Sequence, residues 1–204
     1  MSKASFIVFE GLDGSGKGTQ ISMLTSRLES EGVTLFTTCE PTQFSTGGLI
    51  RDALGGLTKR SPSELAALFL ADRISHCAAI KKMLDSGRTV ICDRYYYSSF
   101  AYQGMDTDLR WVMDSNLNCP DIIKPDMCLF LDVPPEVCDH RIEAGRASRE
   151  IYEAPEAIKK IRAKYMDVFS LLPDHNIRLI NAARSAQDVA SDVYEAVTQV
   201  IKSK

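Results

Sequence analysis

A glycine-rich loop near the start of the chain constrains the fold more than any other feature of the sequence. Residues 11–19 read GLDGSGKGT, follow the apolar stretch 5–10 and precede a segment with apolar residues at helical spacing. The pattern GxxxxGK between a strand and a helix is typical of a phosphate cradle, because glycines let successive backbone N–H groups turn inward. We therefore expect a strand, a loop and a helix that hold a phosphate group, with Lys17 reaching the outer phosphates.

One position of this loop departs from the usual pattern. Ser or Thr normally follows the lysine and helps to hold Mg²⁺, whereas this chain has Gly18 and then Thr19. Thr19 is the candidate metal-binding hydroxyl, and the sequence leaves the exact magnesium contact open. The local sequence GKGT resembles the loop of adenylate kinases.

Composition and charge narrow the class of protein. The chain has 204 residues, of which 45% are hydrophobic and 25% charged, and a formal net charge of −3. These values are typical of one globular domain, here spanning 1–204, and argue against a disordered or disulfide-based chain. A chain without net positive charge is not expected to bind nucleic acid. The longest apolar run, 65–71, is too short to span a bilayer, and we expect no membrane association and a cytoplasmic location.

Short apolar segments rich in β-branched residues alternate with segments of helical period. The expected strands are 5–10, 33–38, 89–93, 127–133 and 177–181. The expected helices are 17–31, 63–85, 107–117, 135–142, 154–170 and 186–202. Strands that are nearly continuous in apolar residues are typical of parallel sheets covered on both faces. The sequence therefore predicts a three-layer α/β fold, with a five-stranded parallel sheet flanked by helices.

Two segments stand out from this alternation. The segment 63–85 begins with a capping box and is apolar on almost all sides, which predicts either a buried central helix or a subunit interface. Residues 141–153 read RIEAGRASREIYE, are rich in charge and poor in apolar residues, and predict a mobile surface segment.

A phosphate-binding loop alone fits a GTPase switch, a motor ATPase or a small-molecule kinase. A switch should carry an Asn-Lys-x-Asp motif, which this sequence lacks, and a motor subunit is usually larger. A kinase needs a second, basic pocket for its acceptor, and Arg51, Arg73 and Arg94 lie at or near the ends of expected elements. Phe69 precedes Arg73 by four residues, so both lie on one helix face. A ring beside a guanidinium suits the base and phosphate of a nucleotide, although each arginine alone could be a solvated surface charge.

Six stretches together resemble the thymidylate kinase family over nearly the whole chain. They are FEGLDGSGKGTQ (9–20), EPT with GGLIR (40–51), LFLADR (68–73), DRYYYSSFAYQG (93–104), KPDMCLFLDVPPEV (124–137) and the arginine-bearing segment that ends in IYE (151–153). The resemblance implies the P-loop kinase fold and phosphorylation of dTMP to dTDP by ATP with Mg²⁺, for the supply of dTTP. It also implies a homodimer. The alternative is another nucleoside monophosphate kinase, which the GKGT sequence favours.

The resemblance further implies which residues bind the acceptor nucleotide. They are Glu40, Arg51, Phe69, Arg73, Arg94, Ser99, Tyr102, Gln103 and Tyr152. The three arginines would grip the dTMP phosphate, and Phe69 would stack on thymine. Ser99 and Gln103 match positions that read the base, and Tyr102 matches a residue that favours deoxyribose by crowding the sugar 2′ position.

The resemblance assigns a second set of residues to ATP, the metal and catalysis. Those implied to bind ATP are Gly11, Asp13, Gly14, Ser15, Gly16, Lys17, Gly18, Thr19 and Arg141, the last by stacking on adenine. Asp93 would hold magnesium through water. The catalytic set is Asp13, Lys17, Arg94, Arg146 and Arg149. Because the phosphate-binding loop has no arginine, the chain resembles the type that carries its catalytic arginine in a lid, about 141–153, whose Tyr152 and Glu153 close over the acceptor.

The expected reaction is a direct, in-line phosphoryl transfer. A phosphate acceptor carries a charge of about −1.5 to −2 at pH 7 and needs no general base. The difficulty is electrostatic, because two polyanions must meet, and the loop lysine, the arginines and Mg²⁺ would supply the opposing charge. Closure of the lid would also exclude water that could hydrolyse ATP.

Overall fold

A single parallel sheet runs through the centre of the molecule. A computed structural model of the chain describes residues 4–145, 152 and 154–203. Its strands are β1 (Phe6–Glu10), β2 (Leu35–Cys39), β3 (Thr89–Asp93), β4 (Met127–Asp132) and β5 (Ile177–Asn181). They are ordered β2-β3-β1-β4-β5, and every neighbouring pair is parallel. The predicted five-stranded parallel sheet is therefore confirmed, with strand ends that differ from the sequence expectation by one or two residues.

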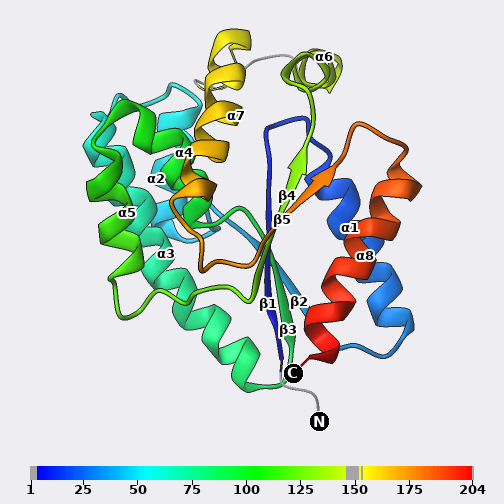
Figure 1. Cartoon of the computed structure of the whole chain (residues 1–204). Helices are drawn as coiled ribbons and strands as arrows, with labels where there is room; N and C mark the ends of the chain where they lie inside the picture. The colour runs from blue at the N-terminus through cyan, green and yellow to red at the C-terminus, as the bar shows by residue number, and fades with distance from the viewer. Residues whose placement is uncertain (1–3, 146–151, 153, 204) are drawn as a thin grey trace.

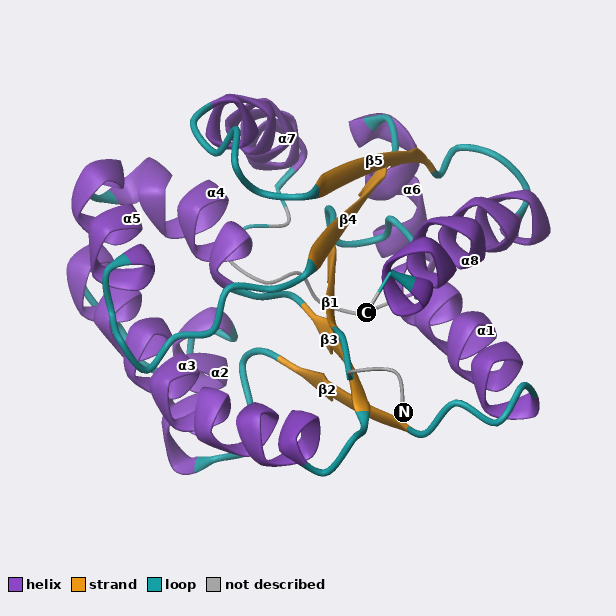
Figure 2. Cartoon of the chain, turned by 60° about the horizontal axis from the view of Figure 1, so that its bottom comes forward, coloured by secondary structure: helices purple, strands orange, loops and turns teal. Residues whose placement is uncertain are grey.

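Helices cover both faces of this sheet. They are α1 (Lys17–Ser30), α2 (Ser45–Leu54), α3 (Pro62–Asp85), α4 (Tyr96–Asp106), α5 (Leu109–Leu117), α6 (Pro135–Gly145), α7 (Pro155–Ser170) and α8 (Ala186–Lys202). Helices α1 and α8 pack together on one face, while α3, α4, α5 and α7 lie on the other (Figures 1 and 2). Helix α6 lies beyond the end of β4 (Figure 1). This arrangement confirms the three-layer α/β fold.

Two helices, α2 and α4, were not expected from the sequence. Helix α2 reads STGGLIRDAL, and its two glycines lower the local helix propensity. Tertiary packing stabilises it, since Ile50 and Ala53 are buried against Leu65 of α3. Helix α4 begins with the aromatic and serine residues YYSSF, which also favour helix weakly. Its first turn depends on a contact with β1 that is described below.

The sheet brings the candidate site together at its carboxyl edge. Strands β1 and β4 are almost completely buried along their length, as expected for the centre of a doubly covered sheet. The segments that follow β1, β2 and β3 are the glycine-rich loop, the segment 40–44 and the turn at 94–95. Because parallel strands end at the same edge, these three segments meet there. No helix in the described part of the chain is long and apolar enough to cross a bilayer.

Candidate functional site

The glycine-rich loop after β1 has the backbone that a phosphate cradle needs. Gly14 and Gly16 have positive φ angles of 78° and 95°. A Cβ on Gly14 would also lie 2.6 Å from the carbonyl oxygen of Cys138, so a side chain does not fit there. Gly16 is the N-cap of α1 and provides no side-chain cap. The first backbone N–H groups of α1 are thus available to an anion, which the helix dipole favours.

Lys17 is held over this loop. Its Nζ donates hydrogen bonds to the carbonyl oxygens of Gly11 (3.0 Å) and Leu12 (3.1 Å), and the residue is only 7% exposed. Burial lowers the pKa of Lys17, and the nearby positive charge of Arg94 adds to this effect. The ammonium group of Lys17 therefore lies at the glycine-rich loop, and its contact with the outer phosphates stays a prediction.

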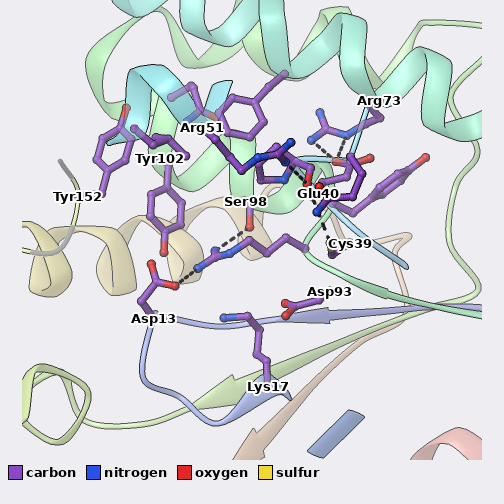
Figure 3. Close-up of a pocket in the computed structure, with 17 residues that line it drawn as sticks. Asp13, Lys17, Cys39, Glu40, Arg51, Arg73, Asp93, Ser98, Tyr102 and Tyr152 are labelled. Carbon is purple, nitrogen blue, oxygen red and sulfur yellow. Dashed lines mark hydrogen bonds and ion pairs between the residues drawn. The ribbon is translucent and has the colours of Figure 1, made fainter. Parts of the chain in front are cut away.

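A cavity of about 360 Å³ opens beside the loop (Figure 3). It brings together eleven of the predicted residues, namely Asp13, Lys17, Glu40, Arg51, Phe69, Arg73, Asp93, Arg94, Tyr102, Gln103 and Tyr152. The predicted base-reading residue Ser99 does not line it, but its hydroxyl accepts a hydrogen bond from Arg73 of the cavity wall. Thr19 does not line it and is exposed on the first turn of α1.

Arg94 connects the loop to helix α4. Its guanidinium donates to Asp13 Oδ1 (2.7 Å) and to Ser98 Oγ (3.1 Å), and it lies over the ring of Tyr102. Burial opposes its charge, but the Asp13 carboxylate raises the pKa of Arg94 well above its ordinary value. The residue has a φ of 67°, a left-handed conformation that is rare outside glycine. Figure 3 shows its two partners, Asp13 and Ser98, both above Lys17 in that view.

Two carboxylates at this end of the cavity suit a divalent cation. Asp93 ends β3, and its Oδ1 atom is buried without a hydrogen-bond partner among the described residues. Asp13 lies on the loop, and Figure 3 shows both carboxylates near Lys17. No group of three or more metal-ligating side chains occurs among the described residues. This donor set fits Mg²⁺, which usually takes one or two carboxylates and completes its shell with water and phosphate oxygens.

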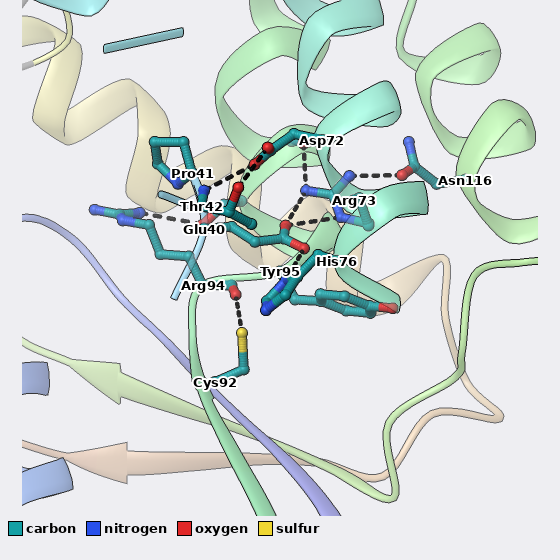
Figure 4. A network of polar contacts seen from close by, with 12 residues as sticks. Glu40, Pro41, Thr42, Asp72, Arg73, His76, Cys92, Arg94, Tyr95 and Asn116 are labelled. Carbon is teal, nitrogen blue, oxygen red and sulfur yellow. Dashed lines mark hydrogen bonds and ion pairs between the residues drawn. The ribbon is translucent and has the colours of Figure 1, made fainter. Parts of the chain in front are cut away.

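A buried polar network forms the far wall of the cavity (Figure 4). Arg73 is 1% exposed and donates to Glu40 Oε2 (2.9 Å), Asn116 Oδ1 (2.6 Å) and Ser99 Oγ (3.0 Å). The other oxygen of Glu40 is 3.0 Å from His76 Nδ1. Most of the N–H groups of the Arg73 guanidinium are used in these contacts. They therefore favour a structural role for Arg73, in which it fixes the position of Glu40 in the cavity wall. A direct grip of Arg73 on the acceptor phosphate stays a prediction.

The segment between β2 and α2 is fastened to helix α3. Asp72 accepts hydrogen bonds from the backbone N–H (2.8 Å) and hydroxyl (2.7 Å) of Thr42, and from the Thr46 hydroxyl (2.6 Å). Arg51 donates to the carbonyl oxygen of Thr42. A Cβ on Gly47 would lie 1.9 Å from that same oxygen, so only glycine fits. The motif EPT with GGLIR thus encodes a tightly held cavity rim.

The lid is described only in part. Arg141 on α6 donates to the carbonyl oxygen of Gly14, which places this predicted ATP-binding residue at the loop. Tyr152 donates to Asp106 Oδ2 (3.0 Å), and its ring packs edge-on against Tyr102. The predicted catalytic residues Arg146 and Arg149, and Glu153, lie outside the described residues.

The sequence analysis missed several residues that organise this site. The most important are Glu10, Asp72, Ser98, Asn116 and Tyr165. Each is buried. Asn116 and Ser98 accept hydrogen bonds from the predicted site residues Arg73 and Arg94, Asp72 holds Thr42 of the cavity rim, and Glu10 and Tyr165 bind Ser98. A signal was present for Glu10, because an acidic residue at the end of a wholly apolar strand needs a buried partner. The others lie on helices whose buried faces the sequence did not distinguish.

Comparisons with known proteins agree with this geometry. A protein-family model described as thymidylate kinase matches residues 9–193. A "Probable thymidylate kinase" of Thermococcus gammatolerans is 36% identical over 208 residues, covering 97% of this chain and 98% of that protein. A "Thymidylate kinase" of Desulfotalea psychrophila is 36% identical over 199 residues, covering 96% and 95%. A "Probable thymidylate kinase" of Methanocaldococcus jannaschii is 36% identical over 190 residues, covering 92% and 93%.

Proposed function

The chain belongs to the thymidylate kinase family and is a nucleoside monophosphate kinase, and we propose that it transfers the γ-phosphoryl group of ATP to dTMP in the presence of Mg²⁺. One observation carries the finer part of this proposal. A single cavity adjoins the phosphate cradle and contains both the cations that suit an acceptor phosphate and the aromatic and amide groups that suit a base.

The acceptor nucleotide is proposed to lie between α3 and α4. Phe69 stacks on thymine, and the amide of Gln103, which is 3% exposed, pairs with the imide edge of the base. Tyr102 lies beside the sugar, where its ring disfavours a 2′-hydroxyl. Arg51 and Arg94 neutralise the acceptor phosphate, and both line the cavity.

The transfer itself is proposed to need positioning and positive charge more than covalent chemistry. The acceptor is already an anion, so no general base is assigned. Lys17 and Arg94 hold positive charge at the cradle, and Arg146 or Arg149 adds it when the lid closes. These groups are in place before charge develops on the moving phosphoryl group, which lowers the cost of the in-line transition state. When the lid excludes water, transfer of the phosphoryl group to dTMP is favoured over hydrolysis of ATP.

Magnesium, when bound, would supply positive charge that opposes the negative charge of the ATP phosphates. Asp93, through water, and Asp13 are the residues proposed to hold it. The buried, unpartnered Oδ1 of Asp93 supports this assignment. Thr19 is a less favourable candidate, because its hydroxyl lies on an exposed turn of α1.

The face of α3 that points away from the sheet supports the homodimer as part of this proposal. In the middle of the helix its exposed residues are small, namely Ala67, Ala71, Ser75 and Ala78, whereas the charged residues Glu64, Lys81, Lys82 and Asp85 are exposed toward its two ends. Small side chains at helical spacing let a second helix approach closely. A single-chain mass in sedimentation equilibrium at micromolar concentration would contradict this dimer.

Replacing Gln103 by Ala tests how the base is read. We expect the affinity ratio of dTMP over dCMP to fall by about 2- to 12-fold, because one buried hydrogen bond contributes about 0.5–1.5 kcal/mol. Titration calorimetry without ATP measures this ratio. Gln187→Ala removes an exposed amide on α8 and should leave the ratio unchanged. An unchanged ratio in Gln103→Ala would remove Gln103 from the base site.

A further inference from the structure

Glu10 is a buried carboxylate that the mechanism above does not use. It is the last residue of β1, directly before the phosphate-binding loop, and is 0% exposed. Its carboxylate accepts four hydrogen bonds, two at each oxygen. Burying a carboxylate is costly unless it is well paired, and here burial raises the pKa of Glu10 while the Arg94 charge opposes that shift.

One oxygen of Glu10 caps helix α4 from another part of the chain. Oε1 accepts the backbone N–H groups of Tyr95 (2.9 Å) and Ser98 (3.1 Å). Tyr95 is the N-cap of α4 and has no side-chain cap of its own. The carboxylate therefore takes the place of the missing cap, and its charge also suits the positive end of the helix. This contact fixes the first turn of α4 to the end of β1.

The other oxygen of Glu10 controls the direction of two hydroxyl protons. Oε2 lies 2.6 Å from Ser98 Oγ and 2.8 Å from the Tyr165 hydroxyl oxygen. An ionised carboxylate has no proton, so both hydroxyls must donate to it. Ser98 Oγ then has only lone pairs left to offer, and it accepts from the guanidinium of Arg94 at 3.1 Å. The charge state of Glu10 thus sets which way Ser98 faces Arg94.

Arg94 depends on this support. Its backbone N–H donates to the carbonyl oxygen of Phe9, the neighbour of Glu10, at 2.8 Å. Its φ of 67° is a strained conformation that the surrounding contacts must hold. Besides Ser98, its guanidinium donates to Asp13 on the glycine-rich loop at 2.7 Å.

We propose that Glu10 is a positioning residue that aims the Arg94 guanidinium at the acceptor phosphate, by capping α4 and by fixing the proton of Ser98. This inference rests on the proposed function, because it assumes that Arg94 contacts dTMP. It assigns to the acidic residue before the glycine-rich loop a role in the acceptor site.

Glu10→Gln tests this role with an almost unchanged shape. In one orientation the amide NH₂ faces the hydroxyls of Ser98 and Tyr165, whose oxygens lie 2.9 Å apart, and both hydroxyl protons lose their carboxylate acceptor. The Ser98 proton is then free to turn toward Tyr165 or toward Arg94. In the other orientation the NH₂ faces the two backbone N–H groups of α4, and donor meets donor at the helix cap. Both arrangements disturb the support of Arg94, and we expect kcat/KM for dTMP to fall by about 10- to 100-fold. The KM for ATP should stay within about twofold, since the hydrogen bonds of Lys17 to the Gly11 and Leu12 carbonyl oxygens are retained.

Two further variants separate positioning from general stability. Ser98→Ala removes the hydroxyl that accepts a hydrogen bond from Arg94 but keeps the backbone N–H that Glu10 binds. We expect its kcat/KM for dTMP to fall nearly as much as that of Glu10→Gln. The double variant Glu10→Gln with Ser98→Ala should be hardly worse than Glu10→Gln, because both act through one hydrogen bond. Tyr165→Phe removes the other hydroxyl donor to Glu10 and should lower the melting temperature without a selective rise in the KM for dTMP.

The outcomes distinguish this inference from the proposed function. If the wild-type chain does not phosphorylate dTMP, the proposed function is wrong. If it does, and Glu10→Gln retains the wild-type kcat/KM for dTMP, the positioning role is wrong. Equal losses toward dTMP and ATP, or losses in the two single variants that add fully in the double variant, would also overturn it, because they would indicate a structural effect alone.

Discussion

Lys17→Met lowers kcat by about 10²- to 10³-fold, the loss expected when one preorganised charged donor is removed from a phosphoryl-transfer site. Methionine keeps the length of the side chain and removes its charge. The ammonium group contacts only the carbonyl oxygens of Gly11 and Leu12 at hydrogen-bond distance in the described structure, so it is free to reach an incoming phosphate. Among the residues that the structure describes, no other lysine lines the cavity.

The same substitution should change stability little. Two carbonyl oxygens lose a donor, which costs stability, but a buried charge whose pKa is lowered by burial is also removed. We expect the free energy of unfolding to change by no more than about 2 kcal/mol. Steady-state kinetics and urea unfolding measure the two quantities separately. Lys202→Met, at an exposed position near the end of α8, is the matched control and should change neither. A Lys17→Met variant with wild-type kcat would remove the lysine from the transfer step.

The second large effect is expected in the lid. Arg146→Ala or Arg149→Ala lowers kcat by about 10²- to 10⁵-fold, the range found for arginines that neutralise a transferring phosphoryl group. The affinity for dTMP should hardly change, because the proposed base-binding residues Phe69 and Gln103 lie on α3 and α4. The large fall in kcat is expected because the phosphate-binding loop has Asp13, Gly14 and Ser15 and no arginine, so the lid must supply this charge.

Single-turnover kinetics and dTMP titration test the lid prediction together. Arg110→Ala is the control, since the side chain of Arg110 is 91% exposed on α5. Near-normal kcat in both lid variants would show that neither arginine acts in the transfer. A loss of dTMP affinity equal to the loss of kcat would instead place the arginine in ground-state binding.

The sequence predicted the sheet and the cradle well because both depend on local patterns. Five short apolar runs and one GxxxxGK loop are each readable within about ten residues, and the structure places them as expected. The basic and aromatic residues of the acceptor cavity were also found, through the spacing of Phe69 and Arg73 and through motifs of the family.

What the sequence did not reveal depends on contacts between distant segments. Helix α4 needs a cap from Glu10, which is 85 residues before Tyr95, and no local pattern indicates that pairing. Helix α2 contains two glycines and becomes helical by packing against α3. Arg73 likewise donates to Glu40, Ser99 and Asn116, which lie in three separate segments of the chain. From the sequence alone, an arginine with such partners could not be distinguished from one that is free to bind a phosphate.

The most direct test of this account is the rate of ADP formation from ATP and Mg²⁺ with dTMP, dUMP, AMP, CMP or no acceptor. The cavity that contains Phe69, Gln103 and Arg94 predicts the highest kcat/KM for dTMP and negligible ADP formation without an acceptor. A preference for AMP or CMP would keep the phosphate cradle but contradict the assignment of the base site. ADP formation that does not depend on the acceptor would contradict the account as a whole.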